Sequence, residues 1–240
     1  MAFLISDRWR RRLAILSAAM VLTTGAAAGA MAMDLRGAPD GPRDRRELVV
    51  LVHGMGRSRL SMWMLGHRLE REGYRVLSWG YSSRDSVPAI GAALADEVAT
   101  VAGEAPRVHF VGHSLGNIVV RWTLAHERPE RAGRVVMLAP PNQGSAAADR
   151  YARYVAWAVP QITELRTVPG STVRALGPAP AGVEVGVIAG SEDGKVSVAE
   201  THLAGERDHV VVPAAHSFLM DRADVGRLTT AFLRTGRFGG

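Results

Sequence analysis

The chain has 240 residues, of which 47% are hydrophobic and 22% are charged. A chain of this length and composition can bury one sizeable core, which excludes a disordered or fibrous protein. The formal net charge is +6, but Arg8, Arg10, Arg11 and Arg12 against Asp7 contribute +3 of it, and about +3 is left for the other residues. So small an excess excludes the strongly basic surface of a nucleic-acid-binding protein.

The N-terminal residues have the pattern of an export signal. An uncharged run over 13–33 follows the arginines and ends in Ala30-Met31-Ala32, which is an A-x-A cleavage pattern. We predict that residues 1–33 are a signal peptide, or an N-terminal membrane anchor in which 13–33 crosses the bilayer. The protein is then exported, and it is periplasmic, secreted or held at the membrane by residues 13–33.

Cysteine is absent from the sequence. Its absence excludes structural disulfides, a thiolate nucleophile and a zinc site with cysteine ligands. An oxidising compartment is compatible with such a chain, but the export prediction depends on the N-terminal pattern alone.

Residues 34–46 are rich in Arg, Asp, Gly and Pro and predict a linker, after which 47–240 form one domain. In this domain strand-like and helix-like runs alternate. The strand-like runs cover 48–52, 75–79, 108–111, 134–138, 183–189 and 209–212, and the main helix-like runs cover 60–72, 87–101, 118–126 and 218–234. This alternation predicts an α/β fold with a compact, mostly parallel sheet of about six strands and helices on both faces.

One long insertion, 140–182, interrupts the alternation. Loops of this length usually carry a function or a helix of their own, and we interpret the segment as a lid-like insertion. Five of its residues could form one apolar helix face: Tyr151, Tyr154, Val155, Trp157 and Ala158. That face would either pack on the sheet as an ordinary helix does or form a lid or acyl-binding wall over a site.

The strongest chemical motif is Gly112-His113-Ser114-Leu115-Gly116, at the end of a predicted strand and before a predicted helix. This G-x-S-x-G pattern is typical of a nucleophile elbow, in which the serine adopts a strained backbone conformation and exposes its hydroxyl. The flanking glycines leave room for so sharp a turn. The alternative interpretation is a glycine-flanked turn without a catalytic role.

A serine hydroxyl needs a base and a carboxylate to become a nucleophile at neutral pH. In the fold that the elbow suggests, the acid follows a late strand, and Asp193 stands just after the strand predicted at 183–189. Asp193 therefore is the predicted acid, and Glu192 and Asp208 are the alternatives. An Asp-Gly turn without a catalytic role would also explain this residue.

His216 follows the last predicted strand and precedes the closing helix, where a general base borne on a loop is expected. Its rivals, His202 and His209, stand before or inside that strand. A helix-capping or partly buried surface histidine is the alternative interpretation of His216.

Two backbone N–H groups are candidates for an oxyanion hole. Leu115 follows the serine at a helix N-terminus, and Met55 lies in the loop after the first strand between two glycines. A tight turn is the alternative interpretation of the second group. The spacing of His53, His113 and His216 fits no common metal motif, and no phosphate-binding loop is present, so no metal and no cofactor are predicted.

These residues resemble those of the α/β-hydrolase superfamily, and within it the bacterial serine lipases and esterases with a His-Gly oxyanion motif. The similar segments are 52–54, 112–116, 139–145 and 193–197, followed by His216. The resemblance implies Ser114 as nucleophile, Asp193 and His216 as its partners, and Met55 and Leu115 as oxyanion donors. Two positions depart from the family: Asn117 replaces a frequent glycine, and no aspartate closely follows His216, so calcium is not predicted.

The sequence thus favours a serine hydrolase that cleaves carboxylic esters, of small molecules or of lipids, through an acyl-enzyme. Three alternatives stay open. The same residues could transfer the acyl group to an alcohol, or could cleave an amide or thioester. A non-catalytic binding module on a hydrolase scaffold is the third.

Overall fold

The computed structural model describes residues 46–82 and 84–239. The predicted signal peptide or membrane anchor, and the predicted linker up to residue 45, lie outside the described residues. Among the residues that are described, no helix combines the length and the apolar character that a bilayer crossing requires.

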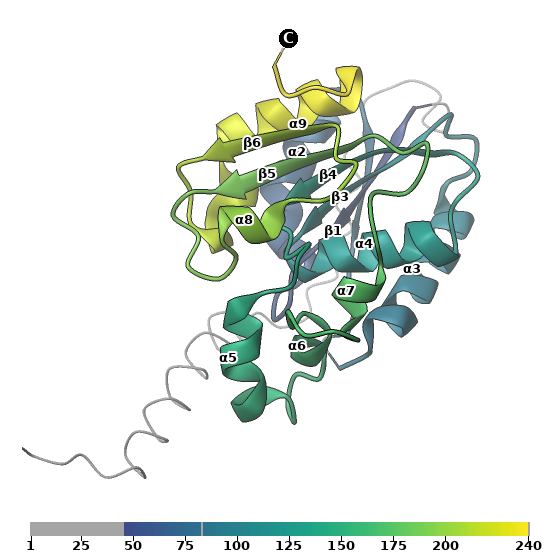
Figure 1. Cartoon of the computed structure of the whole chain (residues 1–240). Helices are drawn as coiled ribbons and strands as arrows, with labels where there is room; N and C mark the ends of the chain where they lie inside the picture. Colours follow the sequence, from purple (N-terminus) through teal and green to yellow (C-terminus); the bar gives the residue numbers. More distant parts are fainter. Residues whose placement is uncertain (1–45, 83, 240) are drawn as a thin grey trace, which may run out of the picture.

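Six parallel strands form one sheet in the order β2-β1-β3-β4-β5-β6. The strands are β1 (Leu48–Val52), β2 (Arg75–Trp79), β3 (Val108–His113), β4 (Ala132–Leu138), β5 (Val185–Gly190) and β6 (Asp208–Val212). All residues of β1, β3 and β5 are buried, as expected for a parallel sheet that is covered on both faces. The predicted α/β architecture is therefore confirmed, and Figure 1 shows the helices on either side of the sheet.

Two hydrophobic clusters hold the layers together. On one face, α3 (Val87–Val101) and α4 (Leu115–His126) bury residues such as Leu94 and Ile118 against the sheet. On the other face, α2 (Trp63–Arg71) and α9 (Ala223–Thr235) bury Leu65 and Phe232. Because all six strands are parallel, their carboxyl ends lie along the same edge of the sheet.

Several elements differ from their predicted bounds. The first helix-like run divides into the 3-10 helix η2 (Arg59–Met62) and α2, and the last into η3 (His216–Asp221) and α9. The second break occurs at Arg222, whose backbone is extended and whose guanidinium pairs with Asp224 in the first turn of α9. β3 continues to His113 because this polar residue still pairs with β4, which an apolar pattern cannot indicate.

The segment 140–182 forms three short helices, α5 (Ala146–Val155), α6 (Gln161–Glu164) and α7 (Thr172–Ala175), and Figure 1 shows α5 projecting from the body of the molecule. The aromatic residues of the segment do not pack on the sheet, because Tyr151, Tyr154 and Trp157 are exposed. Small residues such as Ala148 and Ala152 face the core instead. The alternative in which the aromatic face packs on the sheet is therefore wrong, and the role of the segment as a lid stays a prediction.

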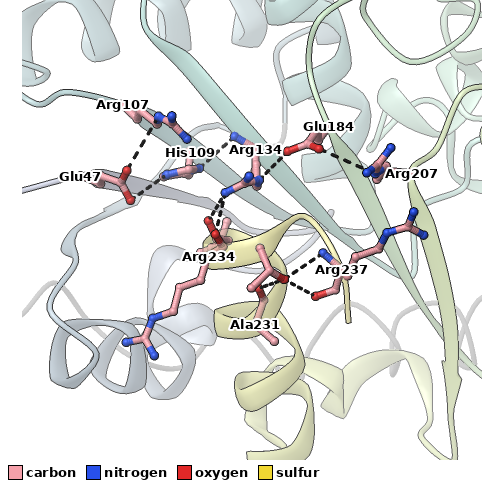
Figure 2. A network of polar contacts seen from close by, with 11 residues as sticks. Glu47, Arg107, His109, Arg134, Glu184, Arg207, Ala231, Arg234 and Arg237 are labelled. Atoms are coloured by element: carbon pink, nitrogen blue, oxygen red, sulfur yellow. Dashed lines mark hydrogen bonds and ion pairs between the residues drawn. The ribbon is translucent and has the colours of Figure 1, made fainter. Parts of the chain in front are cut away.

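Ion pairs connect the strands at their amino ends (Figure 2). Glu47 accepts a hydrogen bond from Nε2 of His109 at 3.3 Å and lies 3.9 Å from Arg107. Farther along this edge, Nε of Arg134 donates to Glu184 at 2.6 Å. These contacts bridge β1 to β3 and β4 to β5.

Candidate active site

Ser114 lies between β3 and α4 in a backbone conformation that few residues other than glycine adopt, with φ +52° and ψ −122°. The glycines on either side are required by close approaches. A Cβ at Gly116 would lie 2.2 Å from the carbonyl oxygen of Val52, and one at Gly112 would lie 2.4 Å from Oδ1 of Asn117. The elbow is thus a sharp turn, and it leads the chain from the sheet into α4.

The structure brings Ser114, His216 and Asp193 together from three separate segments. Nε2 of His216 lies 3.0 Å from Oγ of Ser114, and Nδ1 lies 2.6 Å from Oδ2 of Asp193. Since an ionised carboxylate only accepts, Nδ1 of His216 donates to Asp193 and Nε2 carries the lone pair. In this tautomer His216 accepts the hydrogen bond of the serine hydroxyl, as a base in contact with a nucleophile requires.

Asp193 has a second set of contacts that fix its position. Its Oδ1 accepts hydrogen bonds from the backbone N–H groups of Lys195 at 2.8 Å and Val196 at 2.9 Å. The side chain is completely buried. The turn after β5 and the hydrogen bond to His216 therefore depend on the same carboxylate, so the two interpretations of Asp193 do not exclude each other.

The rival residues lie elsewhere. Glu192 is exposed, and Asp208 begins β6, where its carboxylate accepts from the backbone N–H of Phe238 at 2.8 Å. The imidazole rings of His202 and His209 stack on each other with centroids 4.0 Å apart. Only His216 among the three rival histidines contacts Ser114 in the described structure.

Two buried residues that the sequence analysis did not place in the site support it. Nε2 of His113 donates to the backbone carbonyl of His216 at 2.9 Å, and burial lowers the pKa of His113 well below its ordinary value. Nδ2 of Asn117 donates to the carbonyls of Ser114 at 3.2 Å and Leu138 at 3.0 Å. His113 therefore helps to position the loop that bears His216, and Asn117 connects the elbow to the end of β4.

The loop after β1 carries the predicted oxyanion donor Met55. Nδ1 of His53 donates to the carbonyl of Gly54 at 2.9 Å, and the N–H of Arg57 donates to the same oxygen at 3.2 Å. These bonds fix the peptide that joins Gly54 to Met55. Burial lowers the pKa of His53, whose neutral ring stacks on Tyr81 at a centroid distance of 4.2 Å.

Leu115 begins α4, and an N–H in the first turn of a helix has no acceptor within that helix. The N–H of Leu115 is therefore available to a negatively charged oxygen near Ser114. Convergence of the Met55 and Leu115 N–H groups on one oxygen stays a prediction.

Apolar side chains are exposed next to these loops. Phe218, two residues after His216, is 62% exposed, and Leu60 in η2 is equally exposed. Nη2 of Arg57 donates to the carbonyl of Ser217 at 3.2 Å, which links the loop after β1 to the loop that bears His216. The surroundings of Ser114, His216 and Asp193 thus suit a substrate with an apolar part.

The chain is similar to one protein family model and to several solved structures. Residues 42–143 match a family model described as "Putative serine esterase (DUF676)". No curated protein sequence matches the chain. Among solved structures, the mature form of the Bacillus licheniformis lipase BlEst2 is similar with a TM-score of 0.64 and 19% identity, over 83% of this chain and 94% of that one.

Two other solved structures extend the comparison. The metagenomic carboxyl esterase MGS0156 has a TM-score of 0.61 and 20% identity, over 79% of this chain and 70% of its own. Phospholipase PlaB from Legionella pneumophila, in complex with thio-NAD, has a TM-score of 0.59 and 19% identity, over 80% of this chain and 56% of its own. At these identities the likeness establishes the fold.

Proposed function

The chain has the α/β-hydrolase fold, and on this premise we propose that it is a serine hydrolase that cleaves carboxylic esters through an acyl-enzyme. The observation that carries the proposal is the hydrogen-bonded series Asp193, His216 and Ser114, with distances of 2.6 and 3.0 Å. The description of the family model that matches residues 42–143 supports the same chemistry.

In the first half of the reaction, Oγ of Ser114 attacks the ester carbonyl while Nε2 of His216 takes its proton. The N–H groups of Leu115 and Met55 stabilise the oxyanion that forms. The C–O bond to the alcohol then breaks, and His216 returns the proton to the leaving alkoxide. The products of this step are a free alcohol and an acyl group bound to Ser114.

In the second half, water attacks the acyl-enzyme and gives a proton to Nε2 of His216. Collapse of the second tetrahedral intermediate releases the carboxylic acid and returns the proton to Ser114. Throughout, Asp193 holds the Nδ1 proton of His216 and stabilises the imidazolium that forms twice in each cycle. The buried position of this carboxylate strengthens the interaction, since little water screens it.

The substrate is proposed to be an ester with an apolar acyl or alcohol part, of a small molecule or a lipid. The exposed side chains of Leu60 and Phe218 beside the catalytic loops support this choice. Residues 1–33 are proposed to export the chain or to hold it at a membrane, which would bring it to such substrates.

The test is hydrolysis of p-nitrophenyl esters of increasing acyl length by the purified full-length chain. Ser114→Ala is expected to lower kcat by about 10⁴-fold or more, because the nucleophile is lost while the fold is kept. Ser61→Ala is the matched control, since the Ser61 hydroxyl bonds only to the carbonyl of Ser58 in the described structure. Circular dichroism of both variants checks that they are folded.

Other outcomes lead to other functions. If an added alcohol receives the acyl group faster than free acid appears, and Ser114 is needed, the protein is an acyltransferase. If neither product depends on Ser114, the proposal is wrong, and a binding module on a hydrolase scaffold takes its place.

A further inference from the structure

Three potential metal ligands lie close together at the edge of the sheet. They do not belong to the hydrogen-bonded series Asp193, His216 and Ser114. His202 follows the short helix α8 (Val198–Thr201), Glu206 lies in the turn before β6, and His209 is the second residue of β6. Ligand atoms of the three side chains all lie within 4.8 Å of one another. Nδ1 of His202 is only 2.7 Å from Oε1 of Glu206, and the two imidazole rings are stacked 4.0 Å apart.

Neighbouring groups hold these ligands in place. The hydroxyl of Thr201 donates to the carbonyl of Val198 at 2.6 Å, so its oxygen accepts from Nε2 of His209 at 2.9 Å. A neutral His209 that donates from Nε2 has its lone pair on Nδ1. Histidines that bind metals commonly have this arrangement, in which the second ring nitrogen is fixed by an outer hydrogen bond. Oε2 of Glu206 accepts from the N–H of Leu203 at 2.9 Å and leaves Oε1 for the site.

The backbone that carries the cluster is also anchored. Nε2 of Gln143 donates to the carbonyl of His202 at 2.8 Å, and Nδ2 of Asn142 donates to the carbonyl of Thr201 at 2.7 Å. Both amides belong to the loop after β4, and the buried guanidinium of Arg121 donates to Asn142 in turn. The segment between α8 and β6 is therefore held rigidly enough to present a fixed set of ligands.

We propose that His202, Glu206 and His209 bind one Zn²⁺ ion, with water in the remaining coordination position. Two imidazole nitrogens and one carboxylate oxygen are a donor set that zinc accepts readily. Ligand atoms around tetrahedral zinc stand about 3.3 to 3.6 Å apart for bond lengths of about 2.0 to 2.2 Å. A separation at the 4.8 Å limit would therefore shorten by about 1.2 to 1.5 Å, and the 2.7 Å contact between His202 and Glu206 would lengthen. The side chain of His202 is 54% exposed, which lets the ion enter from solvent and the ring move.

The bound ion would join the turn after α8 to the edge strand β6. This strand leads through Val212 to the loop that bears His216, so the ion would stabilise the connection on which the proposed base depends. The inference goes beyond the proposed function and does not depend on it. The prediction of no metal rested on the spacing of His53, His113 and His216, which are not the three ligands proposed here.

The test is calorimetric titration of the full-length chain with ZnCl₂, after removal of metals with EDTA and without a polyhistidine tag. We expect about one Zn²⁺ per chain with a Kd in the micromolar range or below. Saturating zinc should raise Tm by about 5 °C or more, because only the folded chain presents the site. His202→Ala and His209→Ala should each weaken binding by about tenfold or more and remove the Tm shift.

Two control variants make the result specific. His67→Ala removes a histidine that also faces a carboxylate, Glu70 at 3.8 Å, but that belongs to no cluster of three potential ligands among the described residues. This variant should bind zinc as the unchanged chain does. Ser114→Ala should also bind zinc normally, which separates this inference from the proposed activity. The proposal is overturned if the chain binds no zinc, or if His202→Ala and His209→Ala bind as tightly as the unchanged chain.

Discussion

The residues at the two ends of the parallel sheet differ in backbone conformation and in how their charges are paired. At the carboxyl ends of the strands, Ser114 and Ala139 are the non-glycine residues with positive φ among those described, and they follow the two central strands β3 and β4. At the amino ends, Arg134 and Glu184 form a close ion pair that joins two strands (Figure 2). One end holds strained backbone at Ser114, and the other pairs its charged side chains with each other.

This difference leads to a general expectation. Substitutions at the carboxyl end should reduce activity more than stability, because the hydrogen bonds there orient groups for chemistry. Substitutions at the amino end should reduce stability and leave the activity of the remaining folded protein unchanged.

The largest effect in this comparison is expected for Asp193→Asn, which should lower kcat by about 10⁴-fold. An amide at this position donates its N–H to Nδ1 of His216, so the imidazole proton moves to Nε2. In this tautomer Nε2 has no lone pair and cannot accept the proton of the Ser114 hydroxyl. The amide oxygen can still accept from Lys195 and Val196, so the turn should stay intact. Steady-state kinetics and thermal unfolding measure the two effects separately.

Glu192→Gln is the matched control for that variant, because this neighbouring carboxylate is exposed. Its kcat should stay within about twofold of the unchanged enzyme. A severe loss in Glu192→Gln together with a mild one in Asp193→Asn would show that the acid has been assigned to the wrong residue.

At the other end, Arg134→Ala should lower the free energy of unfolding by about 1 to 3 kcal/mol and leave kcat unchanged. The guanidinium of Arg134 is largely buried, pairs with Glu184 and donates to the carbonyls of Leu233 and Arg234 at the end of α9. Urea unfolding followed by circular dichroism measures the loss.

Arg107→Ala serves as the control for the amino end. Its side chain is 55% exposed and lies 3.9 Å from Glu47, so removal should cost about 1 kcal/mol or less. If Arg134→Ala instead lowers kcat at a temperature where it is fully folded, the two ends are coupled and the comparison fails.

The smallest effect concerns pH and His109. Burial lowers the pKa of His109 below its ordinary value of 6.5, although Glu47 opposes this shift. Below about pH 6.5 the unfolded chain therefore binds a proton that the folded chain does not, and the free energy of unfolding falls as the pH falls. Above that pH both states are neutral at this residue and the contribution is constant.

His109→Asn should flatten this dependence by up to one proton per chain. The amide oxygen can replace Nδ1 as the acceptor for the N–H of Arg134, which lies 2.9 Å away. Urea unfolding at several pH values between about 5 and 7.5 gives the slope for both proteins. An unchanged slope in a folded His109→Asn variant would show that His109 does not carry the effect. Burial lowers the pKa of His53, His113 and His209 as well, so part of the slope should persist.

The sequence predicted the elements and residues whose signals are local. Apolar runs indicated all six strands, and the glycines around Ser114 indicated a sharp turn. Order along the chain selected Asp193 and His216, which the structure brings into contact with Ser114.

Residues whose partners are distant backbone groups could not be predicted. His113 and Asn117 donate to the carbonyls of His216 and Leu138, and a sequence carries no signal for a bond to a backbone atom that is distant along the chain. The break at Arg222 was missed because the apolar pattern continues through it. Likewise, the approach of His202 to His209 depends on a turn, and no periodic spacing indicates it.

We propose that His216 and Asp193 activate Ser114 for nucleophilic attack. Reaction of the full-length chain with a fluorophosphonate probe, with the labelled peptide identified by mass spectrometry, tests this claim directly. We expect complete labelling at Ser114, and a labelling rate that is lower by a factor of about 10³ or more in His216→Ala, because the hydroxyl then lacks its base. Absence of labelling at Ser114 in the folded protein, or an equal rate in His216→Ala, would contradict it.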